Sequence, residues 1–387
     1  MRGMVSAEIP TVAGSWLRRG GSIAALVTVF LSVGALALGQ PQTKRYLYLS
    51  TPDGAQSQGR SGNGILIFDI EDDHKFVRRI ELPIFEEGLR GFTGSLETHC
   101  VYYSTMNRRL GCFDLEKETK VWERTYAGGC DRSSITLDGK KIYVPTGWWY
   151  ARADSGLLVV DAQSGDLIER IPVGLKAHNS IVSLDGRRLY LGSETMLTIF
   201  DTKTDKMIRQ IKDVGEKGVF PYTIHSRQDI GYVCLGGHVG FDVVNLKEGK
   251  ILHRVFAGKE PIPHRTHGAG LTPDEKELWI SDQRGKKLFI FDATKMPPAP
   301  KGHVELSDGG HGWICFSLDG KYAWCHTPDV FDVKTKKLVH TLKDESGKPV
   351  SSSKFIEVHF RGGKVVRMSN EFGLGRKHAP QGAASSS

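Results

Sequence analysis

The sequence lacks the short motifs that mark several large enzyme classes. It has no glycine-rich phosphate loop, no Gly-x-Ser-x-Gly nucleophile elbow and no Cys-x-x-Cys-His haem attachment site. None of its six cysteines forms a Cys-x-x-Cys pair, and neither His-x-His nor His-Glu-x-x-His occurs. These absences exclude several kinds of catalysis without choosing among the remaining functions.

Charge of one sign is nowhere concentrated. The 387 residues include 52 Lys and Arg and 44 Asp and Glu, mixed along the chain, so we expect no nucleic-acid partner. Beyond the N-terminal segment, no apolar run is long enough to span a membrane. The apolar content of 39% still permits a large core, and 45 glycines suit a fold with many tight turns.

The first 39 residues have the pattern of a secretory signal peptide. Arg18 and Arg19 precede an apolar or small run over 23–38, and small residues up to Gly39 offer a cleavage site. Removing 1–39, which contain three Arg and one Glu, leaves a net charge of +6. We therefore expect a periplasmic or secreted protein with no membrane span after cleavage. The alternative is an uncleaved anchor, for which the run is short.

One unit recurs seven times: a short apolar strand that ends in Asp, followed by a polar turn and a second strand. The copies end at Asp69, Asp114, Asp161, Asp201, Asp242, Asp292 and Asp332. Their spacings are 45, 47, 40, 41, 50 and 40 residues. A period near 40–45 built only from strands is typical of a β-propeller.

A second hairpin precedes each of these units. The clearest examples are SITLDGKKIYV (134–144), SIVSLDGRRLYL (180–191), GLTPDEKELWI (270–280) and CFSLDGKYAWC (315–325). Asp-Gly between alternating apolar runs is a strong hairpin signal. The sequence thus predicts seven four-stranded antiparallel blades, A to D from the inside out, over residues 40–375. A β-sandwich array would not repeat at a constant period.

The first blade lacks its first strand, so the C-terminus must close the ring. Two segments compete for that place, 354–360 and 364–370, and the register stays open. Residues 376–387 are predicted to form a disordered tail.

These hairpins, each followed by an apolar strand ending in Asp, resemble the YVTN-type repeats of exported bacterial propellers over about residues 45–370. That superfamily includes the heavy-chain-like propellers of quinoprotein amine dehydrogenases. The resemblance implies a propeller fold and permits an enzyme, a subunit that docks a redox partner, or a pure binding module.

The rim where the A strands begin is the predicted site. Aligned on the turn that follows each A strand, His178 and His267 are equivalent, and Asp131 occupies the same position. His311 falls one residue earlier, and Arg90 approaches this position too. His178, His267 and His311 facing one channel mouth could hold Zn or Cu. The alternative is a mouth lined by polar side chains that bind water.

The loops between strands B and C end at the same rim. They and the chain end after the last strand contribute Trp148, Trp149, Tyr150, Arg152, Arg284, His326 and Glu371. Large aromatic residues in a loop indicate a binding surface, unless they fold back and pack between blades.

Two cysteine pairs flank turns nearly symmetrically, Cys315 with Cys325 and Cys100 with Cys112. Each pair is expected on adjacent antiparallel strands, where a disulfide fits, and export favours oxidation. We predict that at least one pair is bridged or close enough to bridge. A register shift of one residue would separate the two sulfurs, which would leave small buried apolar side chains.

The sequence therefore leaves two functions open. The first is an exported, non-catalytic propeller whose rim binds a protein, a glycan or a small molecule. The second is a periplasmic enzyme at the channel mouth, either a metal-dependent oxidoreductase or a histidine-assisted lyase or lactonase. There a histidine would act as general base beside Asp131 or Glu371.

Overall fold

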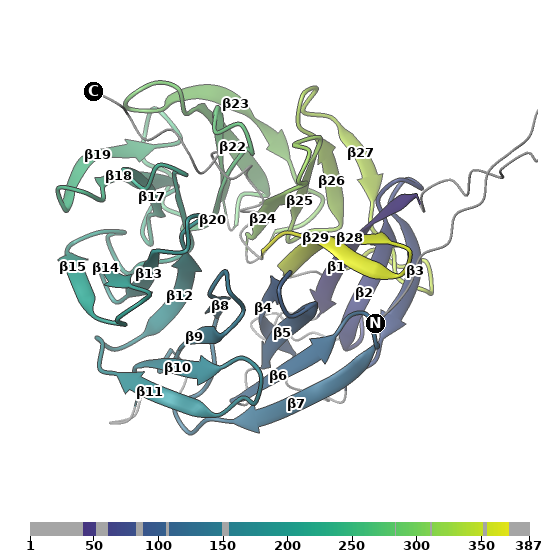
Figure 1. Cartoon of the computed structure of the whole chain (residues 1–387). Coiled ribbons are helices and arrows are strands. Elements are labelled where there is room, and N and C mark those ends of the chain that lie inside the picture. The colour runs from purple at the N-terminus through teal and green to yellow at the C-terminus, as the bar shows by residue number, and fades with distance from the viewer. Residues whose placement is uncertain are drawn as a thin grey trace, which may run out of the picture. The chain divides into compact units, whose positions relative to one another are not determined.

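The computed structural model describes residues 42–51, 61–82, 88–105, 108–148, 155–282, 284–309, 312–350 and 354–370. These residues form 29 strands in seven antiparallel sheets arranged as a ring (Figure 1). The prediction of a seven-bladed β-propeller is confirmed. Within these ranges there is no helix with the length and apolar character needed to cross a membrane. The predicted signal peptide and C-terminal tail lie outside the described residues.

Blades 2–7 each consist of four consecutive strands, A to D, with A nearest the ring centre. Blade 2 contains β4 (Leu89–Ser95), β5 (Cys100–Thr105), β6 (Arg109–Asp114) and β7 (Thr119–Thr125). Blade 3 contains β8 (Ser134–Ile135), β9 (Lys141–Pro145), β10 (Leu157–Asp161) and β11 (Leu167–Ile171). Blade 4 contains β12 (Ala177–Val182), β13 (Arg188–Ser193), β14 (Met196–Asp201) and β15 (Met207–Ile211).

The next three blades repeat this order. Blade 5 contains β16 (Tyr222–Ile224), β17 (Ile230–Cys234), β18 (Gly240–Asn245) and β19 (Lys250–Phe256). Blade 6 contains β20 (Thr266–Leu271), β21 (Glu277–Asp282), β22 (Lys287–Asp292) and β23 (Ala299–Glu305). Blade 7 contains β24 (Ile314–Phe316), β25 (Tyr322–Cys325), β26 (Asp329–Asp332) and β27 (Leu338–Thr341).

Blade 1 joins the two ends of the chain. The N-terminal strands β1 (Thr43–Thr51), β2 (Gly64–Asp69) and β3 (Lys75–Ile80) pair with β28 (Lys354–Arg361), which takes the inner position. In this register Tyr46 lies opposite Val358. β29 (Lys364–Met368) pairs with the end of β28 as a fifth strand. Of the two competing C-terminal segments, the first therefore supplies the missing inner strand, and the second forms an additional strand beside it.

Burial explains why the strands of one blade differ in amino-acid composition. The third strand of blade 3, LLVVD, is buried except at its last residue, whereas the outer strand LIERI is largely exposed. A short continuous apolar run is typical of a strand covered on both faces. The core therefore lies between neighbouring blades, in apolar clusters that draw residues from adjacent sheets.

The repeated Asp at the end of strand C caps the turn that follows it. In blade 4, Oδ1 of Asp201 accepts hydrogen bonds from the backbone amides of Lys203 and Thr204, both at 3.0 Å. An Asx turn of this kind mimics a backbone turn and tolerates the left-handed conformation. This requirement explains why the sequence repeats Asp at these positions.

The choice of Asp242 as the fifth copy is wrong. Strand β18 continues to Asn245, whose Oδ1 accepts the amides of Lys247 and Glu248 at 3.0 and 2.8 Å. Asp242 is instead buried in mid-strand and pairs with Arg254. Asn supplies the same capping oxygen as Asp, so the true repeat position is three residues later.

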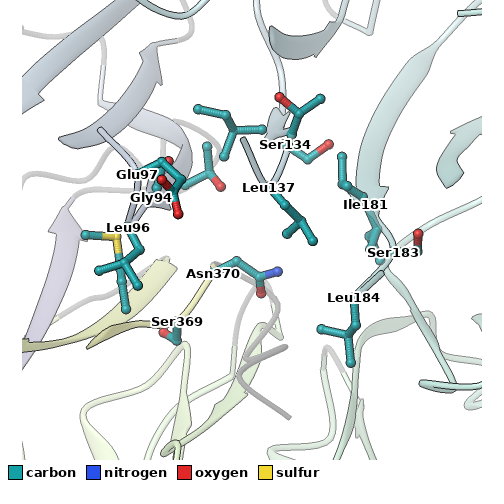
Figure 2. Close-up of a pocket in the computed structure, with 16 residues that line it drawn as sticks. Gly94, Leu96, Glu97, Ser134, Leu137, Ile181, Ser183, Leu184, Ser369 and Asn370 are labelled. Atoms are coloured by element: carbon teal, nitrogen blue, oxygen red, sulfur yellow. The ribbon is translucent and has the colours of Figure 1, made fainter. Parts of the chain in front are cut away.

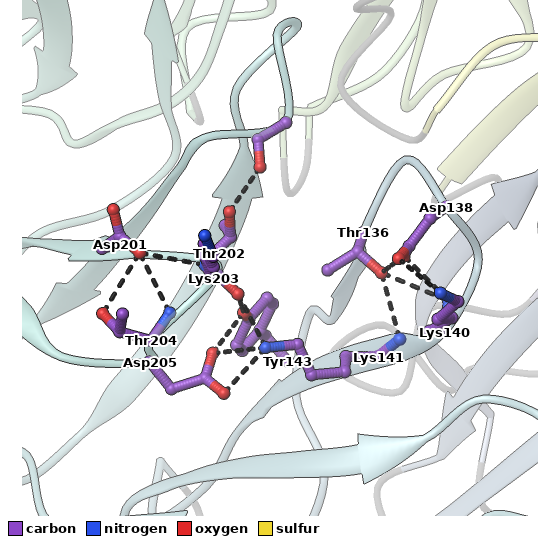
Figure 3. Close-up of polar contacts among 11 residues, drawn as sticks. Thr136, Asp138, Lys140, Lys141, Tyr143, Asp201, Thr202, Lys203, Thr204 and Asp205 are labelled. Carbon is purple, nitrogen blue, oxygen red and sulfur yellow. Dashed lines mark hydrogen bonds and ion pairs between the residues drawn. The ribbon is translucent and has the colours of Figure 1, made fainter.

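The turns also connect neighbouring blades (Figure 3). Lys141 of blade 3 reaches the C–D turn of blade 4, where its Nζ lies 2.7 Å from Oδ2 of Asp205. The hydroxyl of Tyr143 donates to the other oxygen of that carboxylate at 2.6 Å. Because both contacts are partly buried, they fix the angle between two sheets better than an exposed ion pair would.

Of the two candidate cysteine pairs, Cys315 and Cys325 do not fit a bridge. Cys315 lies opposite Trp324, and Cys325 lies opposite Ile314, so the two side chains point to opposite faces of the sheet. They accordingly belong to different apolar clusters. The register differs by one residue from the one that a bridge requires.

Cys100 and Cys112 do lie on one face. Cys100 is opposite Asp114, and Cys112 is opposite Tyr102, which makes the cysteines diagonal neighbours. The two thiols share a hydrogen bond, which lowers the pKa of Cys100. All six cysteines are buried thiols in the structure.

Candidate functional site

Charged and aromatic side chains converge where the inner strands begin. We call this end of the ring centre the start face, defined by Arg90, Asp131, His178, His267 and Lys354. The imidazoles of His178 in blade 4 and His267 in blade 6 lie 6.4 Å apart between ring centroids. Side chains from blades that are not neighbours therefore meet at one place, as the alignment of the A strands predicts.

Asp131 joins three successive blades in a buried ion cluster. Its Oδ1 lies 2.8 Å from Nε of Arg90 in blade 2, and its Oδ2 lies 2.7 Å from Nδ1 of His178 in blade 4. All three side chains are at most 3% exposed. Burial alone raises the pKa of Asp131, but Arg90 and His178 outweigh it and hold the pKa well below its ordinary value. Asp131 is therefore a carboxylate.

The contacts of His178 fix its tautomer. Nη1 of Arg132 lies 2.8 Å from Nε2 and 3.3 Å from Nδ1 of the imidazole. These two distances place the guanidinium over the face of the ring. A carboxylate only accepts, so the ring proton is on Nδ1, which donates to Asp131. Burial is the largest cause that lowers the pKa of His178, and it outweighs Asp131 to give a pKa of about 3. His178 is therefore neutral near pH 7.

Irregular strand pairing aims these side chains. The register between strands A and B shifts between Leu89 and Phe92, between Ala177 and Asn179, and between Thr266 and Ala269. Arg90, His178 and His267 lie within these three shifts. A β-bulge re-aims a side chain relative to a regular strand, so the bulges place one residue from each of three blades at the start face.

Glycine is required where inner strands approach each other closely. A Cβ atom on Gly268 would lie 1.6 Å from the carbonyl oxygen of Gly312 in the next blade. Any larger residue at 268 would push blades 6 and 7 apart and would move His267.

An aromatic wall borders the ion cluster. The indole of Trp148 stacks on His178, with ring centroids 4.1 Å apart and planes 18° apart. The ring of Phe220 packs edge-on against Trp148 and lies 5.6 Å from His267. Arg265 places its guanidinium 4.7 Å from the Phe220 centroid. Trp148 is half-buried, so it contributes a wall to the site rather than an exposed patch.

Two buried cations share the indole of Trp313. The guanidinium carbon of Arg132 lies 5.1 Å from the ring centroid, and Nζ of Lys354 lies 4.1 Å from it. Arg132 and Lys354 come from blades 3 and 1, and they are 0% and 1% exposed. Cation–π contacts of this kind hold both charges near the ring centre.

The remaining predicted residues have different places. Arg284 is exposed, and its backbone amide donates to Asp282 at 3.0 Å. His326 is buried, and its amide donates to the carbonyl of Trp313 at 2.9 Å. Five predicted residues lie outside the described part of the chain: Trp149, Tyr150, Arg152, His311 and Glu371.

The predicted metal site depends on His311, which lies outside the described residues. Nδ1 of His178 is bound to Asp131, so Nε2 is the nitrogen left for a metal ion, and Nη1 of Arg132 lies 2.8 Å from it. Within the described ranges, no three His, Cys, Asp or Glu side chains are grouped to hold a metal ion. The role assigned to His311 stays a prediction.

Sequence reasoning missed Arg132, Phe220 and Trp313. Arg132 and Trp313 occupy the position directly after the aligned one, in blades 3 and 7. Listing that second position across all seven repeats would have revealed a second layer of polar and aromatic residues. Phe220 precedes strand A of blade 5, where no repeat signal exists.

The neutral state of His178 predicts a pH effect on stability. The unfolded chain binds a proton on this histidine below its ordinary pKa of 6.5, whereas the folded protein does so only near pH 3. The free energy of unfolding should therefore fall between those values as pH decreases, by about 1.4 kcal/mol per pH unit from this group. At pH 5 the wild type should take up about one proton more on unfolding than His178→Gln. Equal uptake, measured calorimetrically in buffers of different ionisation enthalpy, would contradict a buried neutral imidazole.

The opposite end of the ring centre, the turn face, has a different character (Figure 2). A pocket of about 270 Å³ lies between the A–B turns of blades 2, 3 and 4 and the residues that follow β29. Leu96, Leu137 and Leu184 line it together with Ser and Thr residues and Asn370. Glu97 is the one charged residue among its lining residues, so this pocket differs sharply from the start face.

Comparisons with known proteins identify the fold and no family. No family model matches the chain, and no curated protein is significantly similar to it in sequence. A solved structure of Kuenenia stuttgartiensis hydrazine synthase is similar, with a TM-score of 0.53 and 17% identity. The match covers 73% of this chain and 86% of that one. At this identity the likeness shows the shared propeller architecture, and the functional assignment depends on the start face itself.

Proposed function

We propose that this protein is an exported ligand-binding propeller whose start face binds a small molecule. The observation that carries the proposal is the convergence of the Asp131 ion cluster and the Trp148 aromatic wall at one end of the ring. Pockets that bind small molecules combine apolar walls with a few precisely placed polar groups. Export is supported by the N-terminal sequence pattern alone.

The geometry favours binding over base catalysis. A histidine that acts as general base needs a free lone pair and a pKa near the working pH. In His178 the guanidinium of Arg132 lies over the ring face, with Nη1 2.8 Å from Nε2, and the pKa of about 3 is far below that range. The Asp131–His178 pair orients the imidazole as a catalytic pair would, but the charge of Arg132 beside the ring opposes the positive charge that a general base gains.

A crystallographic fragment screen tests where the protein binds ligands. Crystals of the protein would be soaked with a general library of neutral and charged fragments. We expect most bound fragments to contact Trp148, Phe220 or His267, because these rings border buried polar groups. Trp148→Ala removes the wall and should abolish these hits.

Leu137→Ala is the matched control, because it alters the turn face and should leave the start-face hits unchanged. If fragments instead collect between Leu96, Leu137 and Leu184, the assignment of the start face as the binding site is wrong.

A further inference from the structure

A second groove lies between blades 4 and 5, apart from both ends of the ring centre. It has a volume of about 350 Å³ and is lined by the A–B turns of both blades, the C–D turn of blade 5 and the outer strand β15. We call it the blade 4–5 groove. It shares no lining residue with the start face or with the turn-face pocket, so it is a separate site.

Basic side chains dominate the blade 4–5 groove. Five of them line it: Arg187, Arg188, Arg209, Arg227 and Lys247. Asp185 is the one carboxylate among the lining residues, and it lies 4.0 Å from Arg187. Arg188 and Arg227 pair with Asp201 and Asp229, each at 3.1 Å. Three carboxylates therefore stand beside five cations among the described residues.

Arg209 and Lys247 are the two cations that no carboxylate of the described residues neutralises. Nη1 of Arg209 donates to the backbone carbonyl of Glu248 at 3.2 Å, and the carboxylate of Glu248 turns to Lys250 instead. Gly249, at φ +76°, leaves room for the arginine, because a Cβ atom there would lie 2.8 Å from Nη1. Backbone contacts thus hold an exposed guanidinium at the groove without cancelling its charge.

The floor of the groove is aliphatic. Ile199 and Leu246 are buried beneath it, and Ile208 is 48% exposed. Tyr190 is the one aromatic residue that lines the groove, but it is 1% exposed and donates to Gln228 at 3.3 Å. The groove therefore offers an apolar floor without an exposed aromatic face.

The outer strand β15 supplies one wall of the groove. Its sheet has the order β12-β13-β14-β15, so one edge of β15 has no neighbouring strand among the described residues (Figure 1). Four of its five residues, 207–210, are exposed. A free strand edge presents unpaired N–H and C=O groups, to which an extended peptide can add as a further strand.

We propose that the blade 4–5 groove binds an extended acidic segment of another protein, which pairs with the free edge of β15. Aliphatic side chains of the segment lie against Ile208, and acidic ones bind Arg209 and Lys247. A polyanionic glycan has neither backbone amides for the strand edge nor aliphatic side chains for the floor, so these features favour a peptide. This site is independent of the start face and of the ligand proposed to bind there.

Fluorescence anisotropy on the purified protein tests the inference. The probes are three labelled peptides of one length, in which Leu alternates with Glu, with Gln or with Lys. We expect saturable binding of the Leu-Glu peptide that weakens as salt is added, weaker binding of the Leu-Gln peptide and no binding of the Leu-Lys peptide.

Arg209→Gln should weaken binding of the Leu-Glu peptide by about tenfold, because a charge-assisted hydrogen bond is lost. Arg170→Gln is the matched control. Arg170 is also exposed and lies on β11, the outer strand of blade 3, so the same change of charge there should leave the affinity unchanged.

Backbone N-methylation of the Leu-Glu peptide tests the strand pairing. Methylating alternate residues removes N–H donors and keeps every side chain. In an added strand only one alternate set of amides faces β15, so methylation of that set should abolish binding and methylation of the other set should be tolerated. Equal affinity of both methylated peptides and the parent would overturn the strand pairing.

Three further results would overturn the inference: no saturable binding of the Leu-Glu peptide to the wild type, equal affinity for the Leu-Lys peptide, or undiminished affinity in folded Arg209→Gln. Heparin binding that Arg209→Gln weakens, without binding of the Leu-Glu peptide, would assign the groove to a glycan and refute the peptide. Trp148→Ala should leave peptide binding unchanged, so this site and the start face stand or fall separately.

Discussion

Replacing Asp131 with alanine should lower the free energy of unfolding by about 3–5 kcal/mol. Removing one partner of a buried ion pair leaves an uncompensated buried charge, and losses of this size are typical. Here Arg90 would lose a carboxylate at 2.8 Å, and Nδ1 of His178 would lose its acceptor at 2.7 Å. Urea denaturation followed by tryptophan fluorescence measures the change.

The matched control for this prediction is Asp166→Ala. Asp166 is 73% exposed and lies 3.7 Å from Arg124 across the surface, so its loss should change the free energy by no more than about 0.5 kcal/mol. Equal effects of the two substitutions would show that Asp131 is not the centre of a buried ion cluster.

Replacing Glu357 with alanine should destabilise the closure of the ring by about 3–5 kcal/mol. Glu357 on β28 is 0% exposed and accepts hydrogen bonds from Nε of Arg45 on β1 at 2.9 Å and from the amide of Leu318 in blade 7 at 2.6 Å. His359 donates to the same carboxylate at 2.7 Å. One side chain thus links the N-terminal strand, the C-terminal strand and the neighbouring blade. Breaking such a buried network is among the most damaging single substitutions.

Hydrogen exchange shows which strands lose stability in Glu357→Ala. In Glu357→Ala the amides of β1 and β28 should exchange much faster than in the wild type, whereas those of blade 4 should change little. The exposed residue Glu81, which is 83% exposed, supplies the control variant Glu81→Ala. If β1 and β28 keep their protection in Glu357→Ala, this carboxylate does not hold the ring closed.

The fold was predictable because its signals are local. Asp-Gly turns and apolar strands ending in Asp repeat at a nearly constant period, and each copy predicts a hairpin independently of the others. The misassigned copy at Asp242 shows the limit of this reasoning. Asn245 makes the same capping contacts as Asp, so the turn is capped in the same way by a different residue type.

One of the two candidate cysteine pairs does not fit the observed strand register, for a reason that the sequence does not contain. Near-symmetric spacing around a turn places Cys315 and Cys325 on adjacent strands, but it does not fix the register to a single residue. The observed pairing of Cys315 with Trp324 turns the two sulfurs to opposite faces. Cys100 and Cys112, with similar spacing, happen to lie on one face.

The site was predictable in position but not in detail. Aligning the inner strands places Arg90, Asp131, His178 and His267 at one rim, and the structure brings their side chains together. The contact of Arg132 with Trp313 depends on a side chain of blade 3 that reaches blade 7. Long-range contacts of this kind, and the bulges that aim them, have no signature in a single repeat.

Fragment soaking of wild-type and Trp148→Ala crystals tests most directly whether the start face is the ligand site. We expect electron density for bound fragments against Trp148, Phe220 or His267 in the wild type and none there in Trp148→Ala. Fragments that bind only between Leu96, Leu137 and Leu184, or that stay at the start face in Trp148→Ala, would contradict the claim that this protein binds its ligand at the start face.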